Sequence, residues 1–450
     1  MKRKGINTTH IILASFLAVI LLGSLLLYLP VSAAEGVRVS YTDALFTATT
    51  STCVTGLVTL PTFSTWSPFG QAVILVLIQV GGLGVITVMA GLMLLLNRRM
   101  GLGDRLLLQD SFNLNSMSGL VRFVKRVVKG TFIIEGVGAL LYMTVFVPQF
   151  GARGVWISVF TAVSAFCNAG IDLLGTNSLA DYAFNPVVNT VTVLLIVLGG
   201  LGYIVWWDVV RVVKLRRRQG RKMFGSLTLH SKIAIVATLA LIIGGAVLVF
   251  AFEKDNPATM ANCTVWQKIQ LSLFQSVTTR TAGFFTVAQE NLRVPTATLC
   301  LVLMFIGGSP VGTAGGVKTV TFAVLIMTAV ASLRGKDGIE LFGRRLKPQA
   351  VNKAVAVTCM SFFIMLASTV ALSAVCGGDA LDILYETVSA TATVGLTRGI
   401  TPLLNTAGKL IITVTMYLGR VGPISLASAF VLKREGEQLI QNPTEEISVG

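Results

Sequence analysis

Four short segments of the chain carry residues that could hold a dehydrated cation through backbone oxygens. Each is a run of small and hydroxyl residues that ends on a glycine, at 52–56, 166–170, 279–283 and 391–395. Glycine lacks a Cβ and reaches positive φ, so successive carbonyl groups can turn toward one axis and replace an ion's hydration shell. The glycines are 114, 113 and 112 residues apart, which indicates one unit built four times. Four such loops around one axis would form a cation-selective pore.

The last three residues of each segment are the candidate cation ligands, through their carbonyl groups. They are Val54, Thr55 and Gly56; Asn168, Ala169 and Gly170; Thr281, Ala282 and Gly283; and Thr393, Val394 and Gly395. Short helices that end at these loops would add partial negative charge at the axis, which also favours a cation. Two further glycine steps, 81–84 and 199–202, lie inside apolar runs, where close helix packing is the expected role.

Long apolar runs on both sides of each segment must position the loops. The predicted helices are 11–29, 43–51 and 68–96; 131–147, 155–166 and 186–210; 229–252, 265–278 and 296–333; and 351–375, 381–390 and 407–432. The middle helix of each unit is too short to cross a hydrocarbon core of ~30 Å, so it must enter and return on one side. We predict an all-α polytopic membrane protein with four pseudosymmetric M1–P–M2 repeats, as in potassium channels, around one central pore. It would have eight transmembrane helices and four re-entrant pore helices.

Composition and charge distribution support a membrane protein and argue against a nucleic-acid-binding one. The chain is 54% hydrophobic and only 12% charged, although its net charge is +16. Most of the basic residues fall in five segments at the chain ends or between repeats: 2–4, 98–129, 211–232, 334–353 and 433–434. The positive-inside rule places these segments and both termini in the cytoplasm, and the glycine loops outside. The N-terminal apolar run resembles a signal peptide but is long enough to span, so we expect it to be retained.

The repeats divide the chain into four predicted domains and a tail. The first is 1–129 with a cytoplasmic loop, the second 130–228, the third 229–350, the fourth 351–435, and the polar tail 436–450.

The second helix of the third repeat contains a candidate gate. A helix over 296–333 would be about 57 Å long, nearly twice the membrane core. Its middle, 307–318, holds five glycines and a proline, which favours a broken helix with a loop below the filter. Arg420 lies deep in the last helix, where it could repel cations and donate to loop carbonyls. The candidate gate residues are Gly307, Gly308, Gly312, Thr313, Gly315, Gly316, Lys318 and Arg420. The loop lacks the Gly-Lys-[Ser/Thr] of a phosphate-binding loop, so we expect no nucleotide to bind this chain.

Two charged residues of the pore helices are candidate filter scaffold. Arg280 and Glu386 could pair behind the filter, or Glu386 could face water without a partner. The six cysteines show no metal-ligand spacing. Cys263 and Cys376 hold similar outer positions, so a disulfide between them is an open alternative.

The four loops resemble those of the Trk/Ktr/HKT superfamily of potassium transporters, most closely the membrane subunits of bacterial Ktr systems (the KtrB type). The matching segments are 52–57, 164–170, 276–284 and 388–396, of which the third is the most specific. The resemblance covers about 8–435, and two extra N-terminal helices typical of the Trk type are absent. Gly56 matches the potassium-preferring pattern, whereas some sodium-preferring relatives carry serine. Asn168-Ala169 and Thr281-Ala282 depart from strict fourfold equivalence, which predicts looser selectivity than in tetrameric channels.

The resemblance implies potassium uptake across the cell membrane, with K⁺ held only at filter carbonyls and Na⁺ as a possible activator. It also implies an intramembrane gating loop at the position found above, with an arginine beside it. The expected partners are a second copy in a membrane homodimer, lipids, and a cytosolic RCK-type (KtrA-like) ring that binds the regulatory nucleotide. The chain itself would carry no cofactor and catalyse no reaction. The alternatives are the potassium-binding subunit of an ATP-driven pump, or a sodium-permeable relative.

Overall fold

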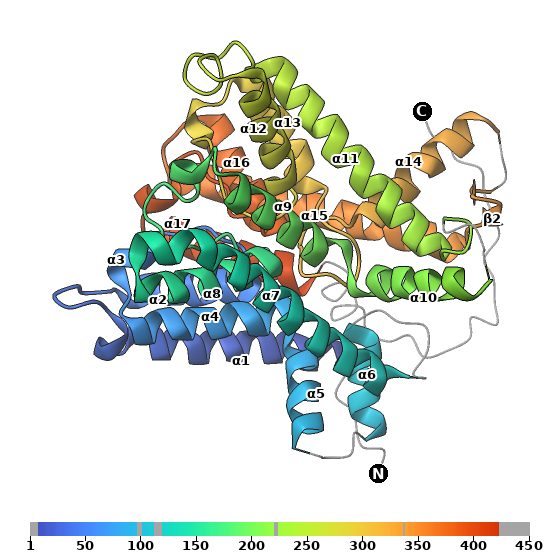
Figure 1. Ribbon diagram of the computed structural model, residues 1–450, viewed down its shortest axis with the longest axis horizontal. Helices are drawn as coiled ribbons and strands as arrows, with labels where there is room; N and C mark the ends of the chain where they lie inside the picture. Colours follow the sequence, from blue (N-terminus) through green and yellow to red (C-terminus); the bar gives the residue numbers. More distant parts are fainter. Residues whose placement is uncertain (1–7, 97–100, 112–118, 220–223, 336–337, 423–450) are drawn as a thin grey trace.

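The computed structural model describes residues 8–96, 101–111, 119–219, 224–335 and 338–422, and these residues are almost entirely helical (Figure 1). The long helices are α1 (Thr8–Tyr28), α7 (Leu120–Phe150), α11 (Leu229–Glu253) and α15 (Pro348–Val375). A short helix follows each of them: α2 (Tyr41–Cys53), α8 (Ala152–Cys167), α12 (Val265–Thr278) and α16 (Ala380–Ala392). Further helices return from the loops: α4 (Pro68–Leu83), α9 (Pro186–Leu201), α13 (Val294–Phe305) and α17 (Thr406–Val421).

The remaining elements are smaller or continue the return helices. They are α5 (Val85–Leu95), α10 (Tyr203–Gln219), α14 (Thr319–Leu333), α6 (Leu102–Ser111), α3 (Thr62–Thr65), and the 3-10 helices Pro30–Ser32, Ala180–Tyr182, Gln289–Asn291 and Thr401–Leu403. Strands β1 (Glu340–Leu341) and β2 (Arg344–Arg345) form an antiparallel hairpin in which Glu340 faces Arg345. Each short helix packs against the long helix before it, as the layered α1, α2 and α4 show in Figure 1.

Local sequence signals explain where the short helices begin and end. The Ser40 hydroxyl caps α2 by accepting from the Asp43 amide, and α12 begins with a capping box formed by Thr264 and Gln267. At their C-termini, α2, α8 and α16 stop because the next residue adopts a left-handed conformation; these residues are Val54, Asn168 and Thr393. The C-terminal ends of these three helices are therefore followed by loops whose backbone cannot continue a helix.

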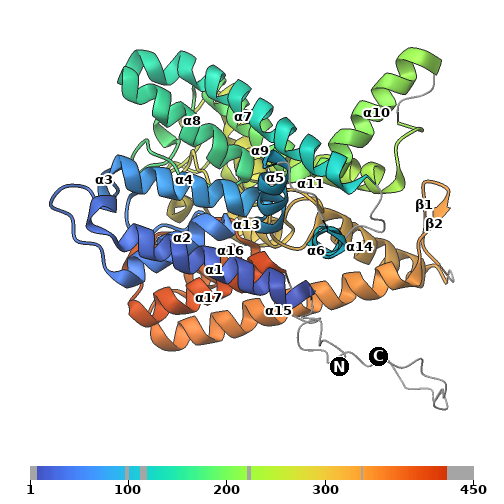
Figure 2. The ribbon, with the colours of Figure 1, turned by 90° about the horizontal axis from the view of Figure 1, so that it is seen from below.

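Two predicted second helices are wrong as continuous elements. The predicted helices 68–96 and 186–210 are each broken, with a bend of 96° between α4 and α5 and between α9 and α10. The break in each pair is a glycine with positive φ, 86° at Gly84 and 91° at Gly202, which a right-handed helix does not accommodate. Figures 1 and 2 show α5 and α10 turning away from the preceding helices. The break predicted in the third repeat is present between α13 and α14.

Other predicted boundaries differ at the ends. Helix α7 begins at Leu120, eleven residues before the predicted start at 131, and so takes in part of the basic segment 98–129. Helix α17 ends at Val421, where Gly422 has φ 92°. The rest of the predicted helix 407–432 and the predicted tail lie outside the described residues.

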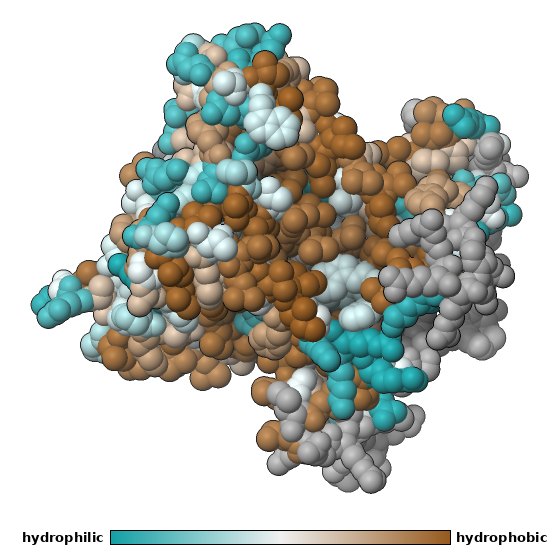
Figure 3. Space-filling view, in the orientation of Figure 1, coloured by the Kyte–Doolittle hydropathy of each residue, from teal (hydrophilic) through white to brown (hydrophobic). Residues whose placement is uncertain are grey.

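In the part of the chain that the structure describes, four helices are long and apolar enough to cross a membrane: His10–Tyr28, Leu120–Phe150, Leu229–Glu253 and Pro348–Val375. Within the described residues the number rises to six if each bent pair is counted as one span. Figure 3 shows apolar residues over the middle of the visible face and hydrophilic residues toward its margins, as expected for a protein surrounded by lipid. The eight spans and the fourfold domain division stay predictions.

Candidate functional site: a ring of four glycine loops

The four loop glycines lie together in one closed ring, although they are more than 100 residues apart in sequence. The atoms that a Cβ built on each glycine would meet show that neighbouring loops are in contact. A Cβ built on Gly56 would lie 2.5 Å from the Ala169 oxygen, and one on Gly170 would lie 2.6 Å from the Ala282 oxygen. The ring continues in order, since a Cβ on Gly283 would meet the Val394 oxygen, and one on Gly395 would meet the Thr55 oxygen. We call Gly56, Gly170, Gly283 and Gly395 the glycine ring. Only glycine allows the four backbones to approach so closely.

The backbone has the same conformation around all four members of the ring. The glycines have φ between 64° and 100°, and the residue two positions earlier is left-handed in each loop. Those residues, with their φ angles, are Val54 (56°), Asn168 (61°), Thr281 (71°) and Thr393 (51°). A non-glycine residue with positive φ is uncommon, and such strain is typical of functional sites. All twelve candidate filter residues therefore lie in loops that share these two backbone features and meet at the glycine ring.

In three of these loops a hydroxyl group of the short helix accepts from a backbone amide of the loop, and sequence reasoning did not identify these hydroxyls. The Thr50 hydroxyl accepts from the Gly56 amide, and the Ser389 hydroxyl accepts from the Gly395 amide, both at 3.0 Å. The Ser164 hydroxyl accepts from the Ile171 amide at 3.0 Å. Each hydroxyl lies six positions before its ring glycine, a spacing that could have revealed the role.

The loop 307–318, which we call the central loop, lies directly against the ring loops. The Thr313 hydroxyl donates to the Phe166 carbonyl at 3.0 Å, and the Gly315 amide donates to the Thr281 hydroxyl at 3.2 Å. A Cβ on Gly315 would lie 2.5 Å from the Ala392 oxygen. The central loop therefore touches residues that precede three of the four ring glycines.

The break at Gly202 gives the central loop its second set of contacts. The Ser309 amide donates to the Gly200 carbonyl at 2.8 Å, and the Tyr203 amide donates to the Val311 carbonyl at 2.8 Å. The loop's ends are joined as well, because the Gly307 amide donates to the Val317 carbonyl at 3.0 Å. The loop is thus anchored on both sides of the α9–α10 break.

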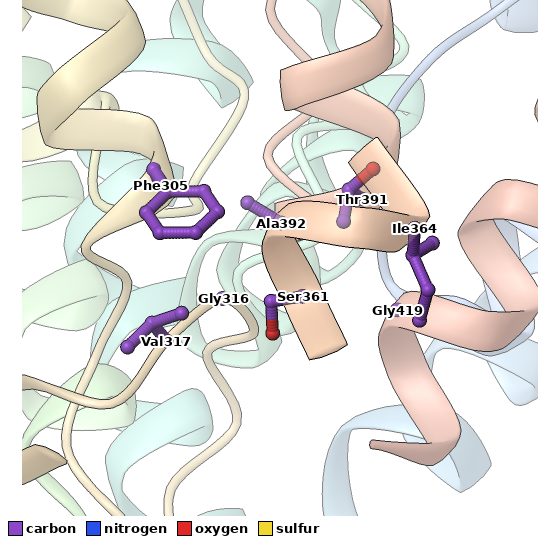
Figure 4. A pocket seen from close by; sticks show the side chains of 8 residues that line it. All are labelled: Phe305, Gly316, Val317, Ser361, Ile364, Thr391, Ala392 and Gly419. Carbon is purple, nitrogen blue, oxygen red and sulfur yellow. The ribbon is translucent and has the colours of Figure 1, made fainter. Parts of the chain in front are cut away.

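A small cavity of about 10 Å³ lies between the central loop and the helices of the last repeat (Figure 4). Its lining includes Phe305, Gly316 and Val317 from the loop side, with Thr391 and Ala392 from the end of α16. This volume is roughly that of one water-sized probe, so the loop and α16 are packed closely in this state.

Arg420 joins the central loop to the first repeat. Its Nη1 donates to the Thr313 carbonyl and its Nη2 donates to the Gly81 carbonyl, both at 2.6 Å. Lys318 donates from Nζ to the Ala314 carbonyl, also at 2.6 Å. Two basic side chains are therefore positioned at the central loop, each held by carbonyl oxygens.

The predicted Arg280–Glu386 pair is wrong. Arg280 instead donates to the carbonyl and the hydroxyl of Thr238, at 3.3 and 3.4 Å. Glu386 accepts from the hydroxyls of Thr397 and Thr401, at 2.7 and 2.5 Å, and is fully buried rather than facing water. Each charge has other hydrogen-bond partners: Thr238 of α11 binds Arg280, and two threonines after α16 bind Glu386, so neither charge needs the other.

Cys263 and Cys376 are free thiols in the structure, and the sulfur of Cys376 contacts Asn405 Oδ1 at 3.7 Å. Within the described residues, no group of three or more His, Cys, Asp or Glu side chains could hold a metal ion.

Two ion pairs near the N-termini of the short helices were also not predicted. Lys409 Nζ lies 2.6 Å from Asp43 Oδ1, and the same oxygen accepts from the Thr59 hydroxyl at 3.0 Å. Asp382 Oδ1 lies 2.6 Å from Arg398 Nε. Asp43 and Asp382 each lie thirteen residues before a ring glycine. Their partners Thr59 and Arg398 each lie three residues after the same glycine. The first pair joins α17 to α2, near the two ends of the described chain.

Comparisons with known proteins agree with this geometry. Residues 3–442 match the family model described as "TrkH: Cation transport protein". The chain is 38% identical to the Ktr system potassium uptake protein B of Bacillus subtilis, over 98% of this chain and 96% of that protein. It is 37% identical to the potassium/sodium uptake protein NtpJ of Enterococcus hirae, over 100% of this chain and 98% of that protein.

A solved structure shares the fold. The crystal structure of the potassium transporter TrkH from Vibrio parahaemolyticus matches with a TM-score of 0.76 and 16% identity, covering 96% of this chain and 86% of that chain. The resemblance inferred from the four loops is therefore confirmed, and the relatives are transporters rather than enzymes. The chain belongs to the TrkH family of cation transport proteins.

Proposed function

We propose that this protein takes up potassium ions across the cell membrane through a filter formed by the glycine ring. The observation that carries the proposal is the ring itself, in which four loops with equivalent backbone conformations meet at one axis. Carbonyl oxygens around such an axis can replace the hydration shell of K⁺. The names of the relatives from Bacillus subtilis and Enterococcus hirae, both of which specify potassium, support this choice of ion.

Each part of the site has a role in this proposal. The ends of the four short helices favour a cation because helix C-termini carry partial negative charge. The central loop obstructs the path on one side of the ring, and Arg420 holds it there through Thr313. The Arg420 charge opposes cation passage in this state. Conduction then requires the central loop to move away, which breaks its hydrogen bonds to the ring loops and to Arg420.

A sodium-permeable transporter is the second candidate, and the name of the Enterococcus hirae relative, which includes sodium, favours it. The nonequivalent pairs Asn168-Ala169 and Thr281-Ala282 could lower discrimination between the two ions. Na⁺ could also act as an activator rather than as cargo. A subunit of an ATP-driven pump is the third alternative, and strict dependence of flux on ATP hydrolysis would identify it.

The deciding experiment is ion flux in liposomes that contain only the purified protein. K⁺, Rb⁺ and Na⁺ gradients would be applied in parallel, with and without ATP inside. We expect K⁺ and Rb⁺ flux that exceeds Na⁺ flux and needs no ATP. Equal fluxes would favour the sodium-permeable alternative, and flux only with ATP would refute the channel-like proposal.

We further propose that the protein is the membrane subunit of a multicomponent system. The names of the Ktr relatives include the word "system". Basic segments between the repeats, such as 98–129 and 211–232, would dock a cytosolic nucleotide-binding ring, and would also contact anionic lipids. The same proposal includes a homodimer in the membrane and cytoplasmic termini. Cross-linking in native membranes tests it: capture of no cytosolic protein at these segments would contradict the docking proposal.

A further inference from the structure

Glu135 is a buried carboxyl in the middle of α7, one of the helices long enough to span a membrane. Only 4% of the surface of Glu135 is exposed, and within the described structure this residue forms no ion pair. Its two oxygens have different partners. Gln79 of α4 donates from Nε2 to Oε2 at 3.2 Å, and the Cys167 thiol of α8 lies 3.8 Å from Oε1 in donor geometry. Ionisable residues at this depth are costly, and they are usually retained for function.

Cys167 connects this carboxyl to the glycine ring. It is the last residue of α8, it directly precedes the left-handed Asn168, and it lies three residues before Gly170. Its sulfur also packs against α4, since a Cβ on Gly82 would lie 2.5 Å from it. The Asn168 side-chain amide has no hydrogen-bond partner in the described structure. Beside the Ser164 hydroxyl, Cys167 therefore gives the second ring loop a contact from behind, which the side chain of Asn168 does not.

We infer that Glu135, acting through Gln79 and Cys167, is a positioning residue that sets the ion discrimination of the second ring loop. The inference rests on the proposed filter function. Its physical basis is that the Ala169 carbonyl borders Gly56 in the ring, so a shift of the loop changes the spacing of ring oxygens. A carboxyl suits the position because it accepts on both oxygens, from the amide on one side and the thiol on the other.

The test compares two substitutions of Glu135 in liposomes that contain the full chain. Glu135→Leu removes both acceptors at similar volume, whereas Glu135→Gln retains one acceptor and the shape. K⁺ and Na⁺ fluxes are measured in parallel and normalised to folded protein. We expect the K⁺/Na⁺ flux ratio to fall about tenfold in Glu135→Leu, equivalent to about 1.4 kcal/mol of lost discrimination, and to recover largely in Glu135→Gln.

A matched control separates positioning from general destabilisation. Tyr142→Phe, also on α7, removes a buried hydrogen bond of 2.6 Å to the Thr192 hydroxyl of α9. This bond does not touch a ring loop, so the variant should lose stability without a change in the flux ratio. Cys167→Ala gives a second approach if Glu135→Leu does not fold, and it should lower the ratio by a similar factor. When Glu135→Leu and Cys167→Ala are combined in one chain, their effects on the flux ratio should be less than additive, because both break the contact between Glu135 and Cys167.

The outcomes distinguish this inference from the proposed function. Selective wild-type flux together with an unchanged ratio in folded Glu135→Leu or Cys167→Ala would overturn the inference alone. A ratio that falls equally in Tyr142→Phe would overturn it too, since the effect would then be unspecific. Absence of flux of either ion through the wild-type protein would refute the proposed function, and the inference with it.

Discussion

Arg420 offers the most direct test of the central loop as a gate. Its guanidinium spans two carbonyls, Thr313 in the central loop and Gly81 at the end of α4. Arg420→Met removes both hydrogen bonds and the charge. Arg420→Lys keeps the charge, but its single ammonium group cannot reproduce the planar two-carbonyl geometry. We expect resting K⁺ flux to rise in both variants and to rise further in the methionine variant.

The size of the effect follows from the one Arg420 bond that the moving loop must break. Gly81 lies outside the central loop, so of the two Arg420 bonds only the one to Thr313 distinguishes the closed loop from an open one. A hydrogen bond to a charged group stabilises by about 1.5–3 kcal/mol. If the bond is lost on opening, its removal shifts the closed–open equilibrium by roughly 10- to 150-fold. Resting flux should rise by up to that factor where the closed state dominates.

The assay is K⁺ flux from proteoliposomes without any partner, normalised to folded protein by size-exclusion chromatography. Arg293→Met is the matched control, because Arg293 also donates to two carbonyls, those of Phe252 and Asp255, but at an exposed position. Resting flux that is unchanged in well-folded Arg420→Met would refute the clamp. A rise in the methionine variant with none in Arg420→Lys would show that the charge, not the hydrogen bond, forms the barrier.

Three further predictions address the ring and its surroundings. In Gly56→Ser, a Cβ would lie 2.5 Å from the Ala169 oxygen at φ 100°, so the ring must widen and the K⁺/Na⁺ flux ratio should fall; an unchanged ratio would exclude Gly56 from the filter. Lys409→Met breaks the 2.6 Å pair with Asp43, so we expect the free energy of unfolding to fall by about 1–3 kcal/mol and the melting temperature to fall with it. Lys409→Arg should keep the pair and the wild-type melting temperature. Equal melting temperatures for all three proteins would contradict a stabilising role for this pair. Burial raises the pKa of Asp172, two residues after Gly170, to about 6, so its carboxylate forms as pH rises. Cation uptake should therefore increase between about pH 5 and 7, and should show no such step in Asp172→Asn.

The loops could be predicted from sequence because their signal is local and repeated. A regular spacing of glycines after hydroxyl-rich short helices defines both the backbone conformation and the symmetry of the arrangement. The family followed from the same residues. The partner of a buried charge carries no such signal, which is why the Arg280–Glu386 pairing failed. Thr238 is 42 residues from Arg280, and a threonine of this kind is indistinguishable in sequence from many others in the apolar helices.

The broken helices show a different limit. A glycine in an apolar helix usually serves close packing, and the structure does show such packing at Gly82 against Cys167. Residues 81–84 and 199–202 therefore have two roles, of which sequence reasoning found only the first. A signal for the second was present, since Gly84, Gly202 and Gly422 each follow a ring glycine by about thirty residues. All three adopt φ between 86° and 92°.

The breaks also explain where the central loop finds its hydrogen-bond partners. At a helix end, the last carbonyl groups have no amide donor within the helix. At the end of α9, the Gly199 carbonyl accepts from the Thr313 amide at 3.1 Å, and the Gly200 carbonyl accepts from the Ser309 amide at 2.8 Å. At the end of α4, the Gly81 carbonyl accepts from Arg420. The central loop and Arg420 thus take the place of the next helical turn. If the loop opens as proposed, the Gly199 and Gly200 carbonyls lose these donors and water takes their place, which keeps the free-energy difference between the two states small.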